Sequence, residues 1–411
     1  MPHALAQAVE IFTTAMTLAG IAYFVAAMVA AQAFLRERRA VIPAFAPGVS
    51  ILKSLKGLDP EMLDAFRSHC RQSYLGKYEL LFGVSGTGDP AASAVAQVKI
   101  EFPDLPIRLI ACPERLGTNG KVSTLAQLVP HARHEFLLIN DSDITVSPRY
   151  LEHTMAHFAP PTPDVVQAAV YAAVQTAHTP EPPVGLVTAL YRGRAHGTLA
   201  SRLEALGIAT EFQPGVLVSK MIEGGMRYGL GSTLAVRREA LDKIGGLEPL
   251  KDCLADDYEL GARVAAAGYR VALSAEVVQT SIPAYGWRGF IDHQLRWLRT
   301  VRDARPGGYT GLVFTHGLGW SLLNVLASGV SPLSLWLLGM SFFLRLAMAM
   351  TVGVSVLGDH QVLDGLWLLP MRDLIALALW VAGFAGNTIV WRGERFELKR
   401  GELLKAEPTK S

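Results

Sequence analysis

Cysteine and charge are both scarce in this chain. Its three cysteines, Cys70, Cys112 and Cys253, are far apart and odd in number, so neither a disulfide framework nor a CxxC metal site is expected. Such a cysteine set is typical of a reducing location that faces the cytoplasm. The net charge of +2 is too small to favour a nucleic acid as a partner.

Apolar sequence, by contrast, is abundant. Hydrophobic residues make up 50% of the chain and charged residues only 18%, a balance that indicates a membrane protein. Residues 11–35 carry no charge and are long enough for a bilayer-spanning helix, which needs about 20 residues. Arg36, Arg38 and Arg39 follow at once, so the positive-inside rule places this end in the cytoplasm. A cleaved signal peptide fits poorly, because no basic segment precedes the apolar run.

A second hydrophobic zone lies towards the C-terminus. Its candidate spans are roughly 311–330, 332–357 and 374–391, with arginines on both flanks. Both flanks therefore look cytoplasmic, whereas three full spans would put the C-terminus outside. Either one candidate is re-entrant, or Trp367–Pro370 enters the membrane together with 374–391. Arg345 lies inside the second candidate, and we expect it on a packed face or an interface rather than in lipid.

The middle of the chain, from about 45 to 305, predicts a cytoplasmic α/β domain. The strand-like runs are Val49–Leu52, Tyr78–Val84, Ile107–Ala111 and Phe136–Ile139, and helical patterns lie between them at 60–72, 90–101 and 120–131. This alternation favours a right-handed α/β unit with a parallel sheet. Ligands of such sheets bind beyond the carboxyl ends of the strands. Gly86–Asp89 and Asp141–Asp143 each follow a strand-like run, so we expect them on one rim.

The second half of this domain is less regular. It offers strand-like runs at Val165–Val170, Val184–Leu190 and Thr233–Val236, and a helix at Arg238–Ile244. The stretch 198–222 is rich in apolar residues. It fits equally an amphipathic segment on the membrane surface and a buried core helix.

Asp141-Ser142-Asp143 is the first candidate for chemistry. On an extended segment, residues two apart point to the same side, so both carboxylates could face one ligand. Oxygen ligands suit Mg²⁺ or Mn²⁺, and magnesium characteristically uses one or two carboxylates plus substrate phosphates. The alternative is a solvated turn at a strand end, and the motif by itself does not decide between them.

Three further acidic residues, Asp252, Asp256 and Asp257, precede a helical run that ends before Gly268. Aspartate at a helix start commonly caps the helix and offsets its dipole, which is the simpler interpretation of each residue taken alone. The chemical alternative is that one of them removes a proton from an acceptor hydroxyl as a general base.

His293, Arg296 and Trp297 are spaced to share one face of a helix expected at 287–303. A cationic Arg or His could stabilise the charge of a leaving diphosphate, while Trp supplies an apolar wall. A basic helix on the membrane surface with Trp as its anchor is compatible with this role. His131 and His134 fit an ordinary helix end better than zinc. Gly229–Ser232 is no P-loop, because no Gly-Lys-Ser/Thr follows.

Taken in order, these motifs resemble a known family. They are Pro47–Gly57, Gly88–Ala91, Gly117–Ser123, Asn140–Asp143, Leu190–Arg194, Leu254–Tyr258, His293–Trp297, Leu369–Asp373 and Trp391–Gly393. The set resembles the membrane-bound inverting glycosyltransferases of the ceramide glucosyltransferase type, and more closely the hopanoid-biosynthesis glycosyltransferases. The resemblance spans nearly the whole chain and implies a GT-A (Rossmann-like) glycosyltransferase domain with transmembrane helices at both ends.

On the donor side, the resemblance assigns four residues. Asp89 matches the family aspartate that contacts the uracil–ribose end of a UDP-sugar. Asp141 and Asp143 match the D-x-D that holds a divalent metal (Mg²⁺ or Mn²⁺) and the diphosphate. Lys121, in the Gly117–Ser123 motif, is expected among the substrate-binding residues.

On the acceptor side, Asp257 matches the catalytic base, with Asp256 beside it as a substrate-binding residue. His293, Arg296 and Trp297 match the motif that lies near the diphosphate and the acceptor. In the ceramide enzymes the first position is Gln or Arg. The His found here resembles the hopanoid branch, as does Leu190–Arg194, and leaves the role of His293 open.

The resemblance and the composition together predict four parts. They are an N-terminal anchor at 1–40, a cytoplasmic catalytic domain at 41–305, a membrane region at 306–395 and a cytoplasmic tail at 396–411. The predicted protein is a multi-pass enzyme of the inner (cytoplasmic) membrane that moves N-acetylglucosamine from UDP-GlcNAc to bacteriohopanetetrol. The sequence leaves the oligomeric state open.

Other functions are weighed against this prediction. Glucosylation of ceramide or another lipid alcohol from UDP-glucose is the nearest alternative. A processive polysaccharide synthase would need more membrane spans for an export channel. A transporter would need many spans with polar sites at the midplane, and a non-catalytic scaffold would tolerate loss of the acidic motifs that are all occupied here.

Overall fold

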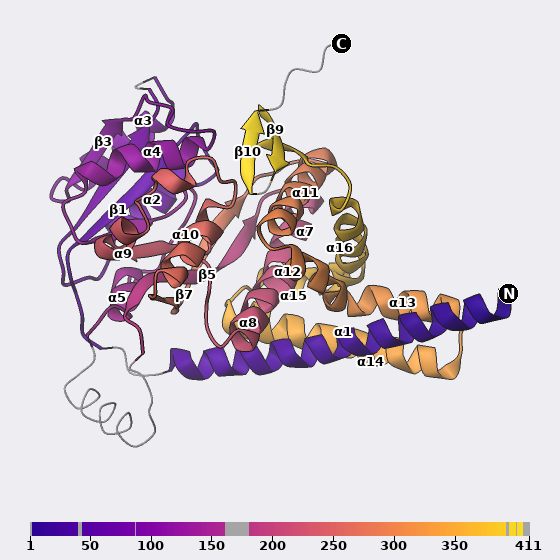
Figure 1. Cartoon of the computed structure of the whole chain (residues 1–411). Coiled ribbons are helices and arrows are strands. Elements are labelled where there is room, and N and C mark those ends of the chain that lie inside the picture. Colours follow the sequence, from indigo (N-terminus) through magenta and orange to yellow (C-terminus); the bar gives the residue numbers. More distant parts are fainter. Residues whose placement is uncertain are drawn as a thin grey trace, which may run out of the picture.

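Figure 1 shows the architecture of the chain, taken from a computed structural model that describes residues 2–39, 43–86, 88–160, 181–391, 394–399 and 401–405. An α/β domain occupies one side and a group of long helices the other. The N-terminal helix α1 (Pro2–Arg38) begins among these long helices, which form the helical arm, and ends below the α/β domain. Strand-like run Val165–Val170 lies outside the described residues.

A seven-stranded sheet with the order β3-β2-β1-β4-β6-β5-β7 organises the α/β domain. Its strands are β1 (Val49–Leu55), β2 (Tyr78–Val84), β3 (Ile107–Ala111), β4 (Phe136–Ile139), β5 (Val184–Ala195), β6 (Leu234–Arg237) and β7 (Arg270–Ile282). The first four strands, β1 to β4, are parallel to one another, as the sequence predicted. β6 pairs antiparallel with both β4 and β5, so the sheet is mixed rather than wholly parallel.

Helices cover both faces of this sheet, because alternate strand residues point to opposite sides. One face packs on α2 (Met62–Cys70), α3 (Ala91–Glu101) and α5 (Tyr150–Ala156). The other face packs on α4 (Gly120–Leu128), α9 (Arg238–Lys243) and α10 (Asp256–Ala266). The second core continues without a break into the membrane helices, since Phe24 and Met348 belong to it. The core of the α/β domain and the helical arm therefore share one apolar interior.

The stretch 198–222 forms three consecutive helical segments, α7 (Leu199–Gly207), the π-helical η2 (Ile208–Phe212) and α8 (Gln213–Ile222). Leu203, Ala209 and Leu217 are buried in the larger core. Of the two possibilities that the sequence left open, the buried core helix is the one found. α11 (Trp287–Ala304), which carries His293 and Trp297, matches the helix expected at 287–303.

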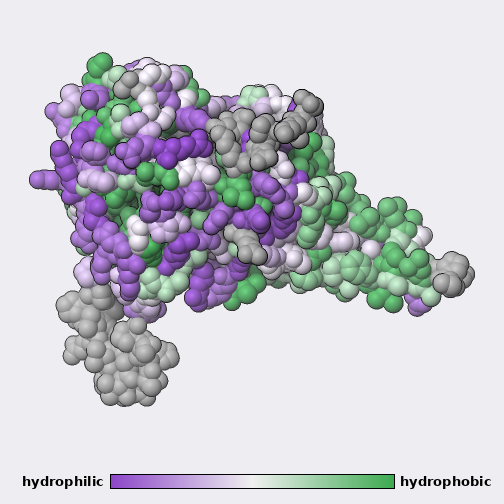
Figure 2. All heavy atoms as spheres, turned by 45° about the horizontal axis from the view of Figure 1, so that its top comes forward, coloured by the Kyte–Doolittle hydropathy of each residue, from purple (hydrophilic) through white to green (hydrophobic). Residues whose placement is uncertain are grey.

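Within the described part of the chain, three helical stretches are long and apolar enough to span a membrane: Ala4–Arg38, Pro332–Val356 and Gln361–Gly383. The elements after α11 are α12 (Pro306–Gly311), η4 (Leu312–Thr315), α13 (Gly317–Ala327), α14 (Pro332–Ala349), η5 (Met350–Val356), α15 (Gln361–Gly365), η6 (Leu366–Leu368) and α16 (Leu369–Gly383). Figure 2 shows the apolar surface gathered on this arm and the polar surface on the α/β domain.

Two of the predicted spans need correction. The candidate 311–330 contains only the 11-residue helix α13 after a short 3-10 turn, because His316 and the glycines beside it interrupt the helix. The predicted bounds 374–391 are shifted towards the C-terminus. The helical stretch starts at Gln361 and ends at Gly383, and residues 388–391 are a strand. Trp367–Pro370 thus belongs to the same stretch as 374–383, which was one of the two alternatives.

Helices α1 and α13 cross at a point where neither has a side chain. A Cβ atom added to Gly20 would lie 2.2 Å from the Cα of Gly317. Only glycine permits so close an approach of two backbones. The crossing fixes the N-terminal helix against the C-terminal membrane region.

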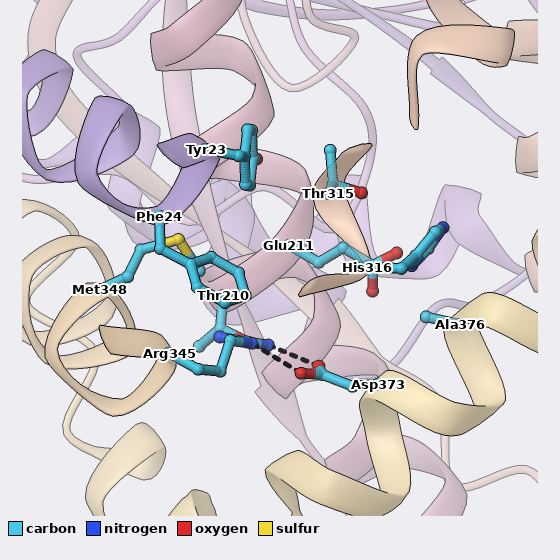
Figure 3. A pocket seen from close by; sticks show the side chains of 10 residues that line it. All are labelled: Tyr23, Phe24, Thr210, Glu211, Thr315, His316, Arg345, Met348, Asp373 and Ala376. Atoms are coloured by element: carbon cyan, nitrogen blue, oxygen red, sulfur yellow. Dashed lines mark hydrogen bonds and ion pairs between the residues drawn. The ribbon is translucent and has the colours of Figure 1, made fainter. Parts of the chain in front are cut away.

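A buried ion pair joins two of the membrane helices. Arg345 on α14 donates two hydrogen bonds of 2.8 Å to the carboxylate of Asp373 on α16, and only 3% of the Arg345 side chain is exposed. Glu211, His316 and Tyr23 face the same small space (Figure 3). Arg345 is thus on a packed face, as expected from its position in an apolar segment.

A three-stranded sheet follows α16, and the predicted cytoplasmic tail at 396–411 begins inside this sheet. Its strands are β8 (Thr388–Trp391), β9 (Glu394–Lys399) and β10 (Glu402–Lys405), in the order β10-β9-β8. Leu403 donates its N–H to the carbonyl of Asp252 at 2.8 Å and packs with Leu254. The C-terminal sheet therefore lies on the loop that leads into α10.

Candidate active site

Acidic residues from two distant motifs meet around one lysine. Lys121 is in the first turn of α4, and its ammonium lies 2.8 Å from a carboxylate oxygen of Asp141 and 3.4 Å from one of Asp256. Burial lowers the pKa of Lys121, but the charges of Asp141, Asp256 and Asp257 outweigh this effect and raise it above the ordinary value. The lysine is therefore a permanent cation in this site.

Asp143 is held from the opposite side by β7. Its Oδ2 atom accepts hydrogen bonds from the hydroxyl of Thr280 and from the N–H of Ser281, the latter at 3.1 Å. Burial, and then the charge of Asp141, raise the pKa of Asp143. The D-x-D therefore lies where the carboxyl end of β4 meets the carboxyl end of β7.

Asp257 is in the first turn of α10, where the residue that precedes the helix is Ala255 and no side chain caps it. Neither Asp256 nor Asp257 therefore caps the helix, although both lie in its first turn, where negative charge offsets the helix dipole. Burial, and then the neighbouring charge of Asp256, raise the pKa of Asp257 to about 6. An added Cβ at Gly231 would be 3.0 Å from Asp257 Oδ2 and 3.6 Å from Asp141 Oδ2. The carboxylates of Asp257 and Asp141 therefore both lie beside Gly231.

Asn119 connects the two halves of this acid cluster. Its side-chain oxygen caps α4 by accepting the N–H groups of Lys121 and Val122. Its amide donates to the carbonyl of Cys253 at 2.8 Å and to Asp256 at 3.3 Å. Asp252, the third acidic candidate, accepts hydrogen bonds from the N–H and hydroxyl of Thr118. Asp252 therefore joins the loop before α10 to the loop before α4, while Asp256 and Asp257 lie close to Lys121 and Asp141.

A buried lysine on β1 contacts the D-x-D, although no sequence pattern had indicated it. Lys53 is only 1% exposed and donates to the carbonyl oxygen of Asp141 at 2.9 Å. Burial lowers its pKa to about 7, although Asp143 and Asp141 oppose this effect. A charged residue inside the strand-like run that begins at Val49 was the available signal, because a buried strand rarely carries an unpaired lysine.

Asp89, the predicted nucleoside contact, lies in the loop between β2 and α3, beside the loop that follows β1. Its carboxylate accepts the N–H of Gly57, at 3.0 and 3.1 Å from its two oxygens, and the N–H of Ala91 at 2.9 Å. Gly57 has φ +73°, a conformation that suits glycine. Asp89 thus holds the loop after β1 against the start of α3.

The motif His293–Trp297 on α11, called the α11 motif below, surrounds a buried carboxylate that no sequence pattern had indicated. Glu204 on α7 has no exposed side-chain surface and lies 2.8 Å from Nδ1 of His293. It also accepts the hydroxyl of Tyr285 and, at 3.4 Å, the amide of Gln294. The rings of His293 and Trp297 pack in a tilted arrangement, with centroids 4.8 Å apart and an interplanar angle of 53°. Glu204 is one of few polar residues in α7, and an acidic residue among apolar neighbours was the feature of the sequence that could have indicated its role.

Tyr191 lies between the acid cluster and the α11 motif. The charges of Asp257, Glu204, Asp141 and Asp143 all act on its hydroxyl, and together with burial, the larger cause, they raise its pKa. Its ring packs beside Phe212, which in turn contacts Trp297. Arg296 is half-buried on the same helix. Tyr191 therefore connects the acid cluster with Glu204 and Trp297.

The carboxylates present fit a divalent cation. Asp141 and Asp143 supply the oxygen ligands that Mg²⁺ and Mn²⁺ prefer, and the raised pKa values of Asp143 and Asp257 reflect burial and crowding of negative charge that a cation would relieve. Within the described residues, no three His, Cys, Asp or Glu side chains enclose a metal by themselves. Such a set is compatible with a cation that takes its remaining ligands from substrate phosphates.

The fold is that of a GT-A glycosyltransferase. The structure aligns with a mannosyltransferase from Pyrobaculum calidifontis, solved in complex with GDP-mannose and Mn²⁺, at a TM-score of 0.51 and 19% sequence identity, over 92% of this chain and 97% of that one. The model of glycosyl transferase family 21 matches residues 12–179 and 173–404. The chain therefore belongs to glycosyl transferase family 21.

Curated relatives of the chain carry the same family's activity in their names. Ceramide glucosyltransferase 3 of Caenorhabditis elegans is 24% identical over 377 residues, which cover 86% of this chain and 73% of that protein. Ceramide glucosyltransferase 1 of the same organism is 22% identical over 374 residues, or 87% of this chain and 73% of its own length. The protein is thus a glycosyltransferase related to enzymes named for a lipid acceptor.

Proposed function

We propose that this protein transfers a sugar from a nucleotide donor to a hydroxyl group of a membrane lipid, with inversion at the anomeric carbon. The observation that carries the proposal is Asp257, a half-buried carboxylate with a pKa of about 6 that faces the D-x-D residue Asp141 across Gly231. A base with a pKa near the working pH is suited to proton transfer. The three candidate spans support a lipid as the acceptor.

In the proposed reaction the acceptor oxygen attacks the anomeric carbon from the face opposite the leaving nucleotide. As the new C–O bond forms, the bond from the anomeric carbon to the diphosphate oxygen breaks, and Asp257 takes the hydroxyl proton. Attack from the opposite face inverts the configuration. Lys121, whose ammonium lies between Asp141 and Asp256, holds the acid cluster in place and offsets its charge.

Negative charge develops on the diphosphate as it leaves. A divalent cation held by Asp141 and Asp143 would neutralise part of that charge. Arg296 and His293, on one face of α11, are the protein's own candidates for the same task. If EDTA treatment followed by desalting leaves turnover unchanged, Asp141 and Asp143 are not metal ligands.

For the substrates, we propose UDP-N-acetylglucosamine as donor and a hopanoid, bacteriohopanetetrol, as acceptor. The motif Leu190–Arg194 and the histidine at position 293 support this choice, because both resemble the hopanoid branch more than the ceramide enzymes. Glucosylation of ceramide from UDP-glucose is the second candidate, and the ceramide glucosyltransferases among the relatives favour it. Asp89 is the proposed contact to the nucleoside in either case.

We further propose that the enzyme is a multi-pass protein of the inner membrane with its catalytic domain in the cytoplasm. Arg36, Arg38 and Arg39 at the end of α1 support this orientation. UDP-sugars are then available on the same side as the acid cluster.

The experiment that tests the function is a product assay with two donors and two acceptors. Purified protein in detergent receives UDP-GlcNAc or UDP-glucose together with bacteriohopanetetrol or ceramide, and the lipid products are identified by mass spectrometry. A hexosamine adduct of the hopanoid supports the first candidate, and a hexose adduct of ceramide supports the second. Absence of any glycolipid from all four mixtures contradicts the proposed function.

A further inference from the structure

A second cavity, of about 280 Å³, lies beyond the carboxyl end of β5. It is lined by Ala195, Gly197, Arg202, Ala205, Leu206, Asp359, Gln361, Val362, Asp364, Gly365 and Leu368. The cavity next to Arg345 and Asp373 has only about 10 Å³, which is room for about one water molecule. The larger space approaches the lower end of the range for small-molecule sites, about 300–1,000 Å³. It can therefore hold a headgroup, although not a whole lipid.

The larger cavity adjoins the acid cluster. Gly197 follows His196, whose Nε2 is 2.7 Å from the hydroxyl of Ser281. The N–H of that same serine donates to Asp143 at 3.1 Å. Two residues thus separate the cavity wall from the D-x-D.

The cavity also adjoins the α11 motif. Ala195 and Ala205 line it, and both belong to a small apolar cluster that includes Tyr285 and Trp297. A ligand in this space would lie on the same rim as the predicted acceptor-side residues.

The lining is suited to hydroxyl groups. Arg202 and Asp364, both exposed at the mouth, bring opposite charges, and the Arg202 guanidinium donates to the Asp364 carbonyl at 3.4 Å. Gln361 bridges the end of β5, since its side chain accepts the N–H of Ala195 at 3.1 Å and donates to Gly193 at 3.0 Å. Carboxylates accept hydrogen bonds from hydroxyls, and a guanidinium donates to them. Leu206, Val362 and Leu368 supply an apolar side.

The membrane side of the cavity is the start of a candidate span. Gln361–Gly383 begins in the cavity wall, and two large apolar residues close to it, Leu363 and Trp367, are 43% and 70% exposed. Exposed tryptophan at the end of an apolar helix is typical of a membrane–water interface. An amphiphile could therefore place its head in the cavity and keep its hydrocarbon part in the bilayer.

We infer that this cavity binds the hydroxyl-bearing headgroup of the lipid acceptor, with Arg202 and Asp364 as its specificity-determining contacts. The inference rests on the proposed function, because it assigns the acceptor subsite of that reaction. A headgroup with several hydroxyls would use both charged residues, and its reacting hydroxyl would point along the rim to Asp257.

The test uses the full chain in detergent micelles and the single variants Arg202→Ala and Asp364→Asn. Both side chains are exposed, so neither change empties the core. Loss of a hydrogen bond to a charged group costs about 1.5–3 kcal/mol, so we expect the acceptor KM to rise roughly 10-fold or more while the donor KM is unchanged. Lys99→Ala and Asp104→Asn, exposed on the remote side of the α/β domain, are the matched controls.

A second readout separates this inference from the proposed function. The thermal stability of wild type and variants is measured with bacteriohopanetetrol and, separately, with short-chain ceramide. Stabilisation of the wild type that both variants lose supports the site even if no glycolipid forms, in which case the proposed function alone fails. The inference is overturned if neither lipid stabilises the wild type, or if both variants turn over with unchanged acceptor KM.

Discussion

The ammonium group of Lys121 lies 2.8 Å from a carboxylate oxygen of Asp141, at the meeting point of α4 and the loop after β4. The same ammonium is 3.4 Å from Asp256 and lowers the pKa of Asp257, which burial and Asp256 raise. One lysine therefore influences the D-x-D and the proposed base together. This coupling can be measured through the pH dependence of activity.

Lys121→Met should move the acidic limb of the pH profile to higher pH. The pKa of Asp257 is about 6, and a general base is inactive when protonated, so activity falls as pH drops through this value. Removing the nearby positive charge favours the protonated carboxyl, and its pKa rises further. The measurement is kcat/KM against pH, with Lys121→Arg as the charge-conserving control. An unshifted limb in Lys121→Met would contradict the coupling.

Asp257→Asn should abolish most turnover and leave donor binding intact. A positioned base contributes typically about 10²–10⁴-fold, and the amide cannot accept the proton. Turnover is measured by product formation and donor binding by calorimetry with UDP-GlcNAc. Asp242→Asn, exposed on α9, is the matched control and should behave as wild type. Near-normal turnover in Asp257→Asn would reject the base assignment.

Gly20→Ala should destabilise the helical arm. The added Cβ would lie 2.2 Å from the Cα of Gly317, so α1 and α13 must move apart, and overpacking of this kind costs typically about 1–3 kcal/mol. Thermal unfolding in detergent measures the loss. Gly339→Ala is the control, because a Cβ at that position of α14 meets nothing within 4 Å. Equal unfolding temperatures in the two variants would show that the crossing is not tight.

Leu403→Asp should loosen the loop before α10. Leu403 is 1% exposed and packs on Leu254, so a carboxylate there would be buried without a partner. We expect faster maleimide labelling of Cys253, measured in a chain with Cys70→Ser and Cys112→Ser, together with reduced turnover. Leu404→Asp provides the comparison, since Leu404 is 43% exposed. Labelling at the same rate in both variants would separate the C-terminal sheet from the loop.

Much of the fold could be predicted because local patterns decided it. β2, β3 and β4 have the expected bounds, since each is a short apolar run between polar turns. The strand β6 was expected at Thr233–Val236, but its antiparallel direction could not be predicted, because strand direction depends on where the chain re-enters the sheet. The strands after Asn387 were missed for a similar reason. They alternate apolar and polar residues weakly, and they gain their order from contact with a distant loop.

Within the site, motif residues could be predicted and their supports could not. Asp141, Lys121 and Asp256 lie together as the ordered motifs suggested. Lys53 and Glu204 contact these motifs from other elements, and a contact between residues far apart in sequence leaves no local pattern. Asp252 likewise had two possible roles in sequence, a helix cap or a general base, and only its hydrogen bonds to Thr118 show that it joins two loops.

The C-terminal sheet also sets an order of events during synthesis. The loop at Asp252–Leu254 pairs with β10, and two candidate membrane spans lie between them in the chain. Domains emerge from the ribosome N-terminal end first, so the α/β domain can collapse while this loop still lacks its neighbouring strand. The proposed base would then reach its final surroundings only after the later helices have entered the bilayer, which would keep a half-inserted chain from acting on its donor.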